Sequence, residues 1–119
     1  MWNLDPKKGP IYLQLAEQIV GELLSGRWSP GERLPPSRAM AVEAALNPNT
    51  IVATYDELER RGIIIKRRGI GVFFKDDLDV DAIRMKALAS VCQEFVEKIE
   101  ALGSNRQTII NILSDMRGL

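Results

Sequence analysis

Three short polar side chains stand close together where a helix is expected to begin. Asn47 is a typical N-cap residue, and Asn49 and Thr50 fall in the first turn after it. Amide and hydroxyl groups at this place can hydrogen-bond base edges or phosphates, and the helix N-terminus itself attracts a phosphate. The alternative is that all three side chains only cap the helix.

A basic doublet, Arg67 and Arg68, precedes Gly69 where a hairpin is expected to turn. A basic hairpin tip can reach an adjacent groove of DNA, because narrow A·T-rich grooves attract arginine. The alternative is a solvated edge hairpin whose charges prevent aggregation. Lys66 and Lys75 fit that second interpretation better than they fit a binding role.

The composition excludes most catalytic and metal chemistry. The chain has no histidine, and therefore no imidazole base, Ser-His-Asp triad or histidine metal ligand. Its single cysteine leaves no intramolecular disulfide, CxxC pair or cysteine-rich zinc site. The acidic run at residues 76–81 lacks the glycine and the partner glutamate of an EF-hand. We therefore expect a protein that is not an enzyme and that needs no cofactor or metal.

Charge divides the chain into two parts. The 16 lysines and arginines balance the 16 aspartates and glutamates, so the formal net charge is zero. Residues 1–75 hold eleven basic and eight acidic residues, a balance of +3, and residues 76–119 hold five and eight, a balance of −3. The neutral total therefore does not argue against a nucleic-acid partner. We expect one domain over residues 1–75 and a helical tail over residues 76–119.

Neither a membrane segment nor a secretion signal is expected. No apolar run approaches the roughly 18 to 20 residues of a transmembrane helix, and the first residues do not form a signal peptide. We expect a cytoplasmic protein without a membrane partner.

Three helices are predicted in the first part of the chain. Helical spacing of apolar residues predicts a helix over residues 10–25, with Pro10 in its first turn. Residues 37–45 are rich in alanine and methionine and predict a short second helix. A third helix is predicted from Pro48, after the Asn47 cap, to the stop at Gly62. The second and third helices are joined by few residues and form a helix-turn-helix candidate.

A hairpin is predicted to follow. Residues 63–65 are β-branched, residues 67–71 contain two glycines, and residues 72–74 favour a returning strand. A helix, a helix-turn-helix and a two-stranded hairpin in this order define a winged helix-turn-helix domain. The predicted fold class is mainly α with a small β-hairpin.

Four motifs in this order resemble the GntR family of bacterial transcription regulators. They read LPPSR at residues 34–38, NPNTI at 47–51, YDELERRG at 55–62 and RRGIGVF at 67–73. Residues 3–6 and 10–14 resemble the YtrA-type branch of the family, in which the C-terminal segment is short and helical. The resemblance implies a sequence-specific, homodimeric repressor that binds double-stranded DNA at a pseudo-palindromic operator, and it suggests a transporter operon as the target.

The resemblance also assigns the binding residues. It implies that Arg38, near the start of the second helix, contacts DNA, with Ser37 beside it. It makes the third helix the recognition helix and the hairpin the wing. The implied DNA-binding residues are Ser37, Arg38, Asn47, Asn49, Thr50, Arg67, Arg68 and Gly69.

The sequence departs from the family pattern at three places. Residues 52–54 form the middle of the third helix, and we expect them to be exposed. Relatives often carry a basic residue there. Ile70 stands between the wing glycines, and Ala45 replaces the usual turn glycine, so that turn is expected to lack its positive-φ residue. The missing basic residues predict a modest non-specific affinity and a smaller salt dependence, by about 0.9 in slope per lost phosphate contact.

The tail is predicted to form two amphipathic helices. Apolar residues between 85 and 102 step by 3, 4, 3, 4 and 3, which is an a/d seam on a helix of roughly 23 residues. Ser104 and Gln107 form a capping-box pair that opens a last helix of about 13 residues. Ile109, Ile112, Leu113 and Met116 lie on one side of it.

Two short helices cannot bury such seams alone. They could pack back on the winged helix, or against a second copy of the chain, which is favoured because dimers of winged helices gain a two-fold DNA site. Cys92 is then a small core residue. The tail has no room for a separate ligand-sensing domain, and the existence of an effector stays open. The predicted dimerisation residues are Met85, Leu88, Cys92, Phe95, Ile99, Leu102, Ile109 and Leu113.

One alternative function remains besides DNA-binding regulation. The third helix could dock a protein, which would make the chain a winged-helix interaction module without specific DNA binding. The two functions differ in salt dependence, because only binding to phosphates weakens steeply with salt.

Overall fold

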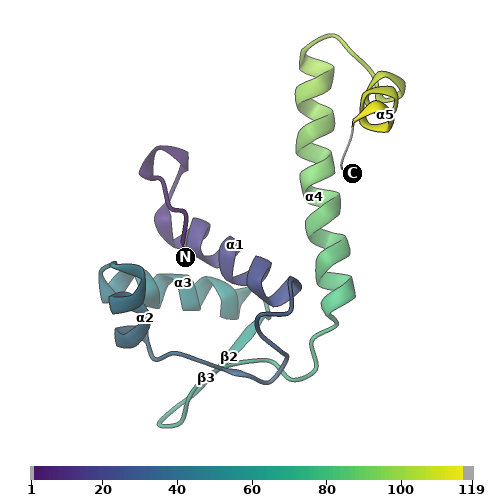
Figure 1. Cartoon of the computed structure of the whole chain (residues 1–119). Helices are drawn as coiled ribbons and strands as arrows, with labels where there is room; N and C mark the ends of the chain where they lie inside the picture. The colour runs from purple at the N-terminus through teal and green to yellow at the C-terminus, as the bar shows by residue number, and fades with distance from the viewer. Residues whose placement is uncertain (1, 117–119) are drawn as a thin grey trace. The chain divides into compact units, whose positions relative to one another are not determined.

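The computed structural model describes residues 2–116, which form two compact units with a boundary after Val80. The first unit contains a 3₁₀ turn, three helices and three strands (Figure 1). These are η1 (Pro6–Lys8), α1 (Ile11–Leu24), β1 (Arg33–Leu34), α2 (Ser37–Ala44), α3 (Pro48–Arg60), β2 (Ile64–Arg67) and β3 (Gly71–Phe74). The second unit is helical, with α4 (Val80–Ala101) and α5 (Arg106–Asp115).

The core of the first unit forms around α3, which packs against α1, α2 and β2. Its residues Ile51, Tyr55 and Leu58 recur at helical spacing and are at most 1% exposed. The Tyr55 hydroxyl donates a hydrogen bond to the Pro35 carbonyl at 2.7 Å, and burial, followed by the charge of Glu43, raises the pKa of this phenol. The other fully buried large side chains are Leu15, Ile19, Leu23, Leu34, Met40, Thr54, Ile64 and Phe74.

The wing is part of a three-stranded antiparallel sheet in the order β1-β3-β2. The hairpin of β2 and β3 was predicted, and its register pairs Ile64 with Phe74 and Arg67 with Gly71. The third strand was not predicted, because β1 has only two residues, too few to show an alternation. β1 pairs Arg33 with Phe73, so it brings the segment before α2 onto the hairpin.

Four helices end in the same way, with a residue of positive φ. Gly26, Gly62 and Gly103 take this position after α1, α3 and α4, at φ values of 86°, 77° and 79°. Ala45 takes it after α2, at φ 55° and ψ 47°. The prediction that this turn lacks a positive-φ residue is therefore wrong, because alanine itself adopts the left-handed conformation. Two hydrogen bonds hold it there, from Ala45 N to Val42 O at 3.2 Å and from Leu46 N to Ala41 O at 2.9 Å, the Schellman pattern.

The N-terminal arm is fixed to α1 by two glutamines one helical turn apart. Gln18 exchanges two hydrogen bonds with the backbone of Asn3, at 2.8 and 2.6 Å. Gln14 does the same with Asp5, at 2.9 and 2.7 Å. Pro10 precedes the helix as its N-cap residue, one position before the predicted first turn.

The second unit corrects the predicted start of the last helix. Asn105, rather than Ser104, is the N-cap of α5, and its side chain accepts from Thr108 N at 3.0 Å. The backbone N–H of Ser104 instead donates to Ile99 O at 3.1 Å and completes the end of α4. The helix α5 is therefore shorter than predicted, with 10 residues, and Met116 lies just beyond it. None of the helices in the described residues is long and apolar enough to cross a membrane.

The left-handed alanine leads to a stability prediction. We expect Ala45→Gly to raise the free energy of unfolding by about 1 kcal/mol, because glycine adopts positive φ without the Cβ clash. The free energy of that clash is larger than the cost of the extra conformational entropy that glycine gives the unfolded chain. Urea denaturation measures it. As a matched control, Ala39→Gly in the right-handed part of α2 should lower stability by about 1 kcal/mol. Equal destabilisation by both variants would contradict the assigned conformation.

Candidate nucleic-acid interface

The start of α3 presents one free amide to solvent. The side chain of Asn47 is the N-cap and accepts from Asn49 N at 2.8 Å, so it orders the first turn. The side chain of Asn49 is exposed and has no hydrogen bond within residues 2–116, and Thr50 is half-buried beside it. Of the three predicted polar residues, Asn49 is therefore the one best placed to reach a ligand.

The middle of α3 is less exposed than predicted. Val52 is 44% exposed and Ala53 is half-buried, but Thr54 is fully buried, and its hydroxyl donates to Thr50 O at 2.8 Å. Including Thr54 in the exposed face was wrong, because the position falls on the same side of the helix as Ile51 and Leu58. The outer surface of α3 is thus narrow and starts at its N-terminal turn.

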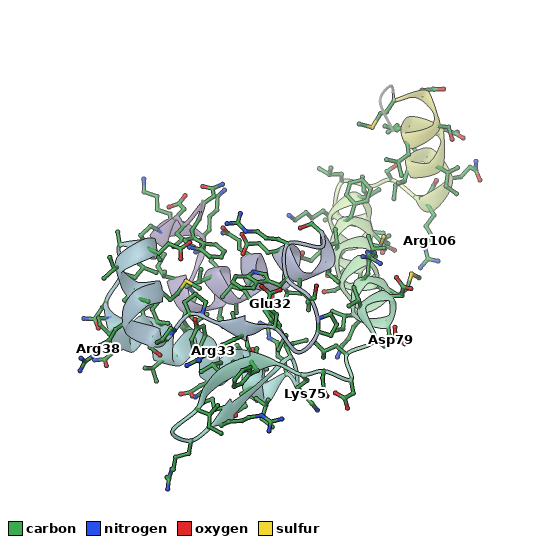
Figure 2. All side chains as sticks on the ribbon, turned by 60° about the horizontal axis from the view of Figure 1, so that its bottom comes forward. Glu32, Arg33, Arg38, Lys75, Asp79 and Arg106 are labelled. Carbon is green, nitrogen blue, oxygen red and sulfur yellow. The ribbon has the colours of Figure 1, made fainter. Side chains whose placement is uncertain are left out.

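Arg38 is the second residue of α2 and points away from the helices into solvent (Figure 2). Ser37, the first residue of α2, is half-buried. Burial of Met40 and Ala41 against the core fixes the rotation of this short helix and therefore leaves Arg38 on its outer side.

The wing turn closes over four residues. The N–H of Ile70 donates to Arg67 O at 2.9 Å, and Gly69 takes φ 74°, which a glycine adopts without strain. Arg68 lies at the tip and is exposed. The hairpin turn extends away from the helices of the first unit (Figure 1).

Arg33 joins the wing, although the sequence analysis did not identify it. Its Nη2 donates to Ile70 O at 2.7 Å. Its guanidinium carbon lies 5.8 Å from the centroid of the Phe73 ring, and that of Arg67 lies 5.9 Å from the same centroid. The only available signal was a lone basic residue before the LPPSR motif, and its place became visible only with the β1–β3 register.

Ion pairs divide the cations of the first unit into two groups. Arg27 pairs with Glu22, Arg60 with Glu57, Arg61 with Glu57 and Glu17, and Lys66 with Asp56. In the part of the chain that the structure describes, Arg33, Arg38, Arg67 and Arg68 form no ion pair, and neither do Lys7, Lys8 and Lys75. Three of the four unpaired arginines were predicted to bind DNA, and Lys66 was predicted not to. The unpaired cations remain available to an external anion.

Glu57 anchors the C-terminal end of α3. Its carboxylate accepts from Arg60 at 2.9 and 2.7 Å and from Arg61 at 2.6 Å. These charged hydrogen bonds lower the pKa of Glu57 to about 2. Arg61 also contacts Glu17 at 2.6 Å and so connects α3 with α1.

An open hollow of about 430 Å³ lies on the outer face of the sheet. Ile65, Ile70 and Phe73 are among its apolar lining residues, and Arg67, Lys75, Asp76 and Asp77 are the charged ones. No group of three or more His, Cys, Asp or Glu side chains in residues 2–116 is placed to hold a metal ion.

A free amide on the first turn of α3, an outward arginine on α2 and a basic hairpin define a DNA-binding winged helix-turn-helix protein. The sequence profile described as "Bacterial regulatory proteins, gntR family" matches residues 11–74. The chain belongs to this family, and it is a transcription regulator rather than an enzyme. The predicted family and fold class are thereby confirmed, with the sheet extended to three strands.

Similar proteins share the short length. The transcriptional regulator YhcF of Bacillus subtilis is 40% identical over 102 residues, 85% of this chain and 84% of YhcF. The transcriptional repressor YtrA of the same bacterium is 37% identical over 87 residues, 72% of this chain and 67% of YtrA. A GntR family regulator from Listeria monocytogenes superposes with a TM-score of 0.84 at 28% identity, over 92% of this chain and 96% of that one. This chain is a short, YtrA-type member of the family.

The Glu57 cluster leads to a pH prediction. Because the pKa of Glu57 is lowered to about 2 in the folded state, its contribution to stability is present above the pKa of an unfolded glutamate, roughly 4.3, and is lost as the pH falls toward 2. Glu57→Gln should therefore lower the urea midpoint at pH 7 by an amount that stays constant to about pH 5 and then shrinks. Glu43→Gln is the control. A Glu57→Gln deficit that is independent of pH down to pH 2 would disprove the assignment.

Proposed function

We propose that this GntR-family regulator acts in the cytoplasm as a homodimeric repressor that occupies a pseudo-palindromic operator. Residues 1–75 bind DNA in this proposal, and residues 76–119 form the dimer. The name of YtrA from Bacillus subtilis as a transcriptional repressor supports the repressor role at 37% identity. Repression of a neighbouring transporter operon is the most specific form of the proposal.

The exposed apolar face of α4 carries the dimer proposal. α4 has 22 residues and no buried side chain. Met85 is 65% exposed, Leu88 50%, Phe95 42% and Leu102 81%, and Cys92 is also exposed. A helix with no buried side chain and several exposed apolar ones gains little stability by itself, because helices in proteins are stabilised mainly by packing. A second copy supplies the same seam to cover it.

Two of the three other predicted residues have a different role in this proposal. Ile99 is half-buried and Ile109 is 7% exposed, the one buried side chain of residues 81–116. We place them inside the tail of one protomer, where they hold its two helices in a fixed shape. Leu113 is 43% exposed and extends the dimer surface onto α5.

DNA contacts are divided between base edges and phosphates. Asn49 offers a side-chain amide that can bond an adenine edge in the major groove, and Arg38 offers a fork for guanine or phosphate. Arg68 reaches the neighbouring groove from the wing. Two copies place two recognition helices about 34 Å, or a multiple of it, apart along the duplex.

The first test of this proposal is DNA binding. Arg38→Ala and Asn49→Ala should each weaken binding to the fragment upstream of the chain's own gene by about tenfold or more, because a good base or phosphate contact contributes roughly 1 to 3 kcal/mol. Fluorescence anisotropy measures the affinity, with Arg27→Ala, an exposed but ion-paired arginine, as the control. Unchanged specific binding by both site variants would refute the assigned residues. In a purified transcription reaction the wild type should reduce the product, and an increase would contradict repression.

The second test is the oligomeric state. Leu88→Asp combined with Phe95→Asp should convert the dimer to a monomer, because two charges would have to be buried in the shared seam. Light scattering at micromolar concentration measures the mass. Ser90→Asp, which lies on the opposite side of α4, is the matched control and should leave a dimer. A monomeric wild type, or a double variant that stays dimeric, would refute this surface.

A further inference from the structure

We propose that Arg33 and Arg67 form a two-guanidinium site on the outer face of the wing sheet and that this site binds a phosphate of the DNA backbone. The proposal deepens the DNA-binding function and depends on it. It adds a contact from β1, a segment outside the helix-turn-helix and the hairpin.

The sheet register brings the two arginines to one place. Phe73 lies on the central strand β3, opposite Arg33 on β1, and Arg67 on β2 pairs with Gly71 two residues away. Both guanidinium carbons lie close to the same ring, at 5.8 and 5.9 Å from its centroid. The two side chains therefore approach Phe73 from the strands on either side of it.

Gly71 provides the space for the Arg33 guanidinium. A Cβ atom at this position would lie 2.7 Å from Nε and 3.0 Å from Cζ and Nη2 of Arg33. One Nη2 hydrogen bond, to Ile70 O, directs the side chain toward the hairpin turn. In residues 2–116 the side chain of Arg33 forms no other hydrogen bond, so its remaining side-chain N–H groups are available to a ligand.

No ion pair within the described residues neutralises the two guanidinium groups, although Asp76 and Asp77 line the same hollow as Arg67. Neither Arg33 nor Arg67 has a carboxylate within ion-pair distance, and two nearby positive charges repel each other. The Phe73 ring stabilises both cations in part. Lys66, between Ile65 and Arg67 on β2, shows the contrast, because Asp56 and Glu59 neutralise it.

A phosphate is the anion that this arrangement suits. Guanidinium groups bind phosphate oxygens through paired N–H donors, and a diester phosphate carries a single charge that two arginines can share. DNA is the source of that phosphate because the site continues toward the turn that carries Arg68. The apolar side chain of Ile70 brings no charge to this turn, and Arg33 supplies one at the Ile70 carbonyl.

The experiment measures how salt weakens binding of the full chain to a fluorescent, random-sequence duplex. Arg33→Gln removes the charge but keeps an N–H donor for Ile70 O, whereas Arg33→Lys keeps the charge. We expect Arg33→Gln to reduce the slope of log K against log [KCl] by about 0.9 for each bound copy, and Arg33→Lys to retain the wild-type slope. Arg27→Ala is the control and should leave it unchanged.

Three results would overturn the proposal, and they are distinguishable. A wild-type slope in Arg33→Gln, while the wild type binds DNA and Arg38→Ala binds it more weakly, would reject only the Arg33 site and leave the DNA-binding function intact. An equal loss in Arg33→Lys and Arg33→Gln, with unchanged thermal midpoints, would show that charge is not the determinant. Failure of the wild type to bind any duplex would remove the DNA-binding function itself.

Discussion

The DNA-binding unit depends on the burial of one face of α3. Ile51, Tyr55 and Leu58 are directed into the core by contacts with α1, α2 and β2, and Thr54 follows them inward. Because this face must be buried, the rotation of α3 is fixed, and Asn49 has to lie on the outer side of its first turn. Asn47 fixes where the helix begins. The orientation of the recognition surface is therefore a result of apolar packing, and the polar side chains only use it.

Ion pairs with carboxylates determine which cations of this unit remain available to bind an anion. α3 carries Asp56, Glu57 and Glu59 in its second half, and these residues engage Arg60, Arg61 and Lys66. Among the described residues, Arg38 on α2, Arg33 on β1, and Arg67 and Arg68 of the wing have no such partners. The balance of +3 over residues 1–75 is thus not spread evenly, because the unpaired positive charge lies on a few residues and the rest is neutralised by ion pairs. A regulator with zero net charge can bind DNA because the carboxylates of α3 pair with Arg60, Arg61 and Lys66 and leave the arginines of α2, β1 and the hairpin turn unpaired.

Local signals predicted most of the fold, and the errors have physical causes. The cap at Asn47 and the stop at Gly62 bounded α3 correctly because both act within one turn of the helix. The left-handed conformation of Ala45 was not predicted because backbone hydrogen bonds, not its residue type, impose it. Ser104 resembled a cap, but the end of α4 uses its N–H and leaves the cap to Asn105. Arg33 was missed because its role depends on pairing with Phe73, far along the chain.

The space above Gly71 has an evolutionary consequence. The guanidinium of Arg33 occupies the volume that a side chain at position 71 would need, and Gly71 also has φ 155°, which favours glycine by itself. A side chain at position 71 would therefore have to displace the Arg33 guanidinium as well as strain the backbone. We expect relatives that lack glycine at position 71 to have changed at position 33 too, although the two positions belong to different strands and different sequence motifs. Covariation between them in related sequences would be the genetic record of that shared volume.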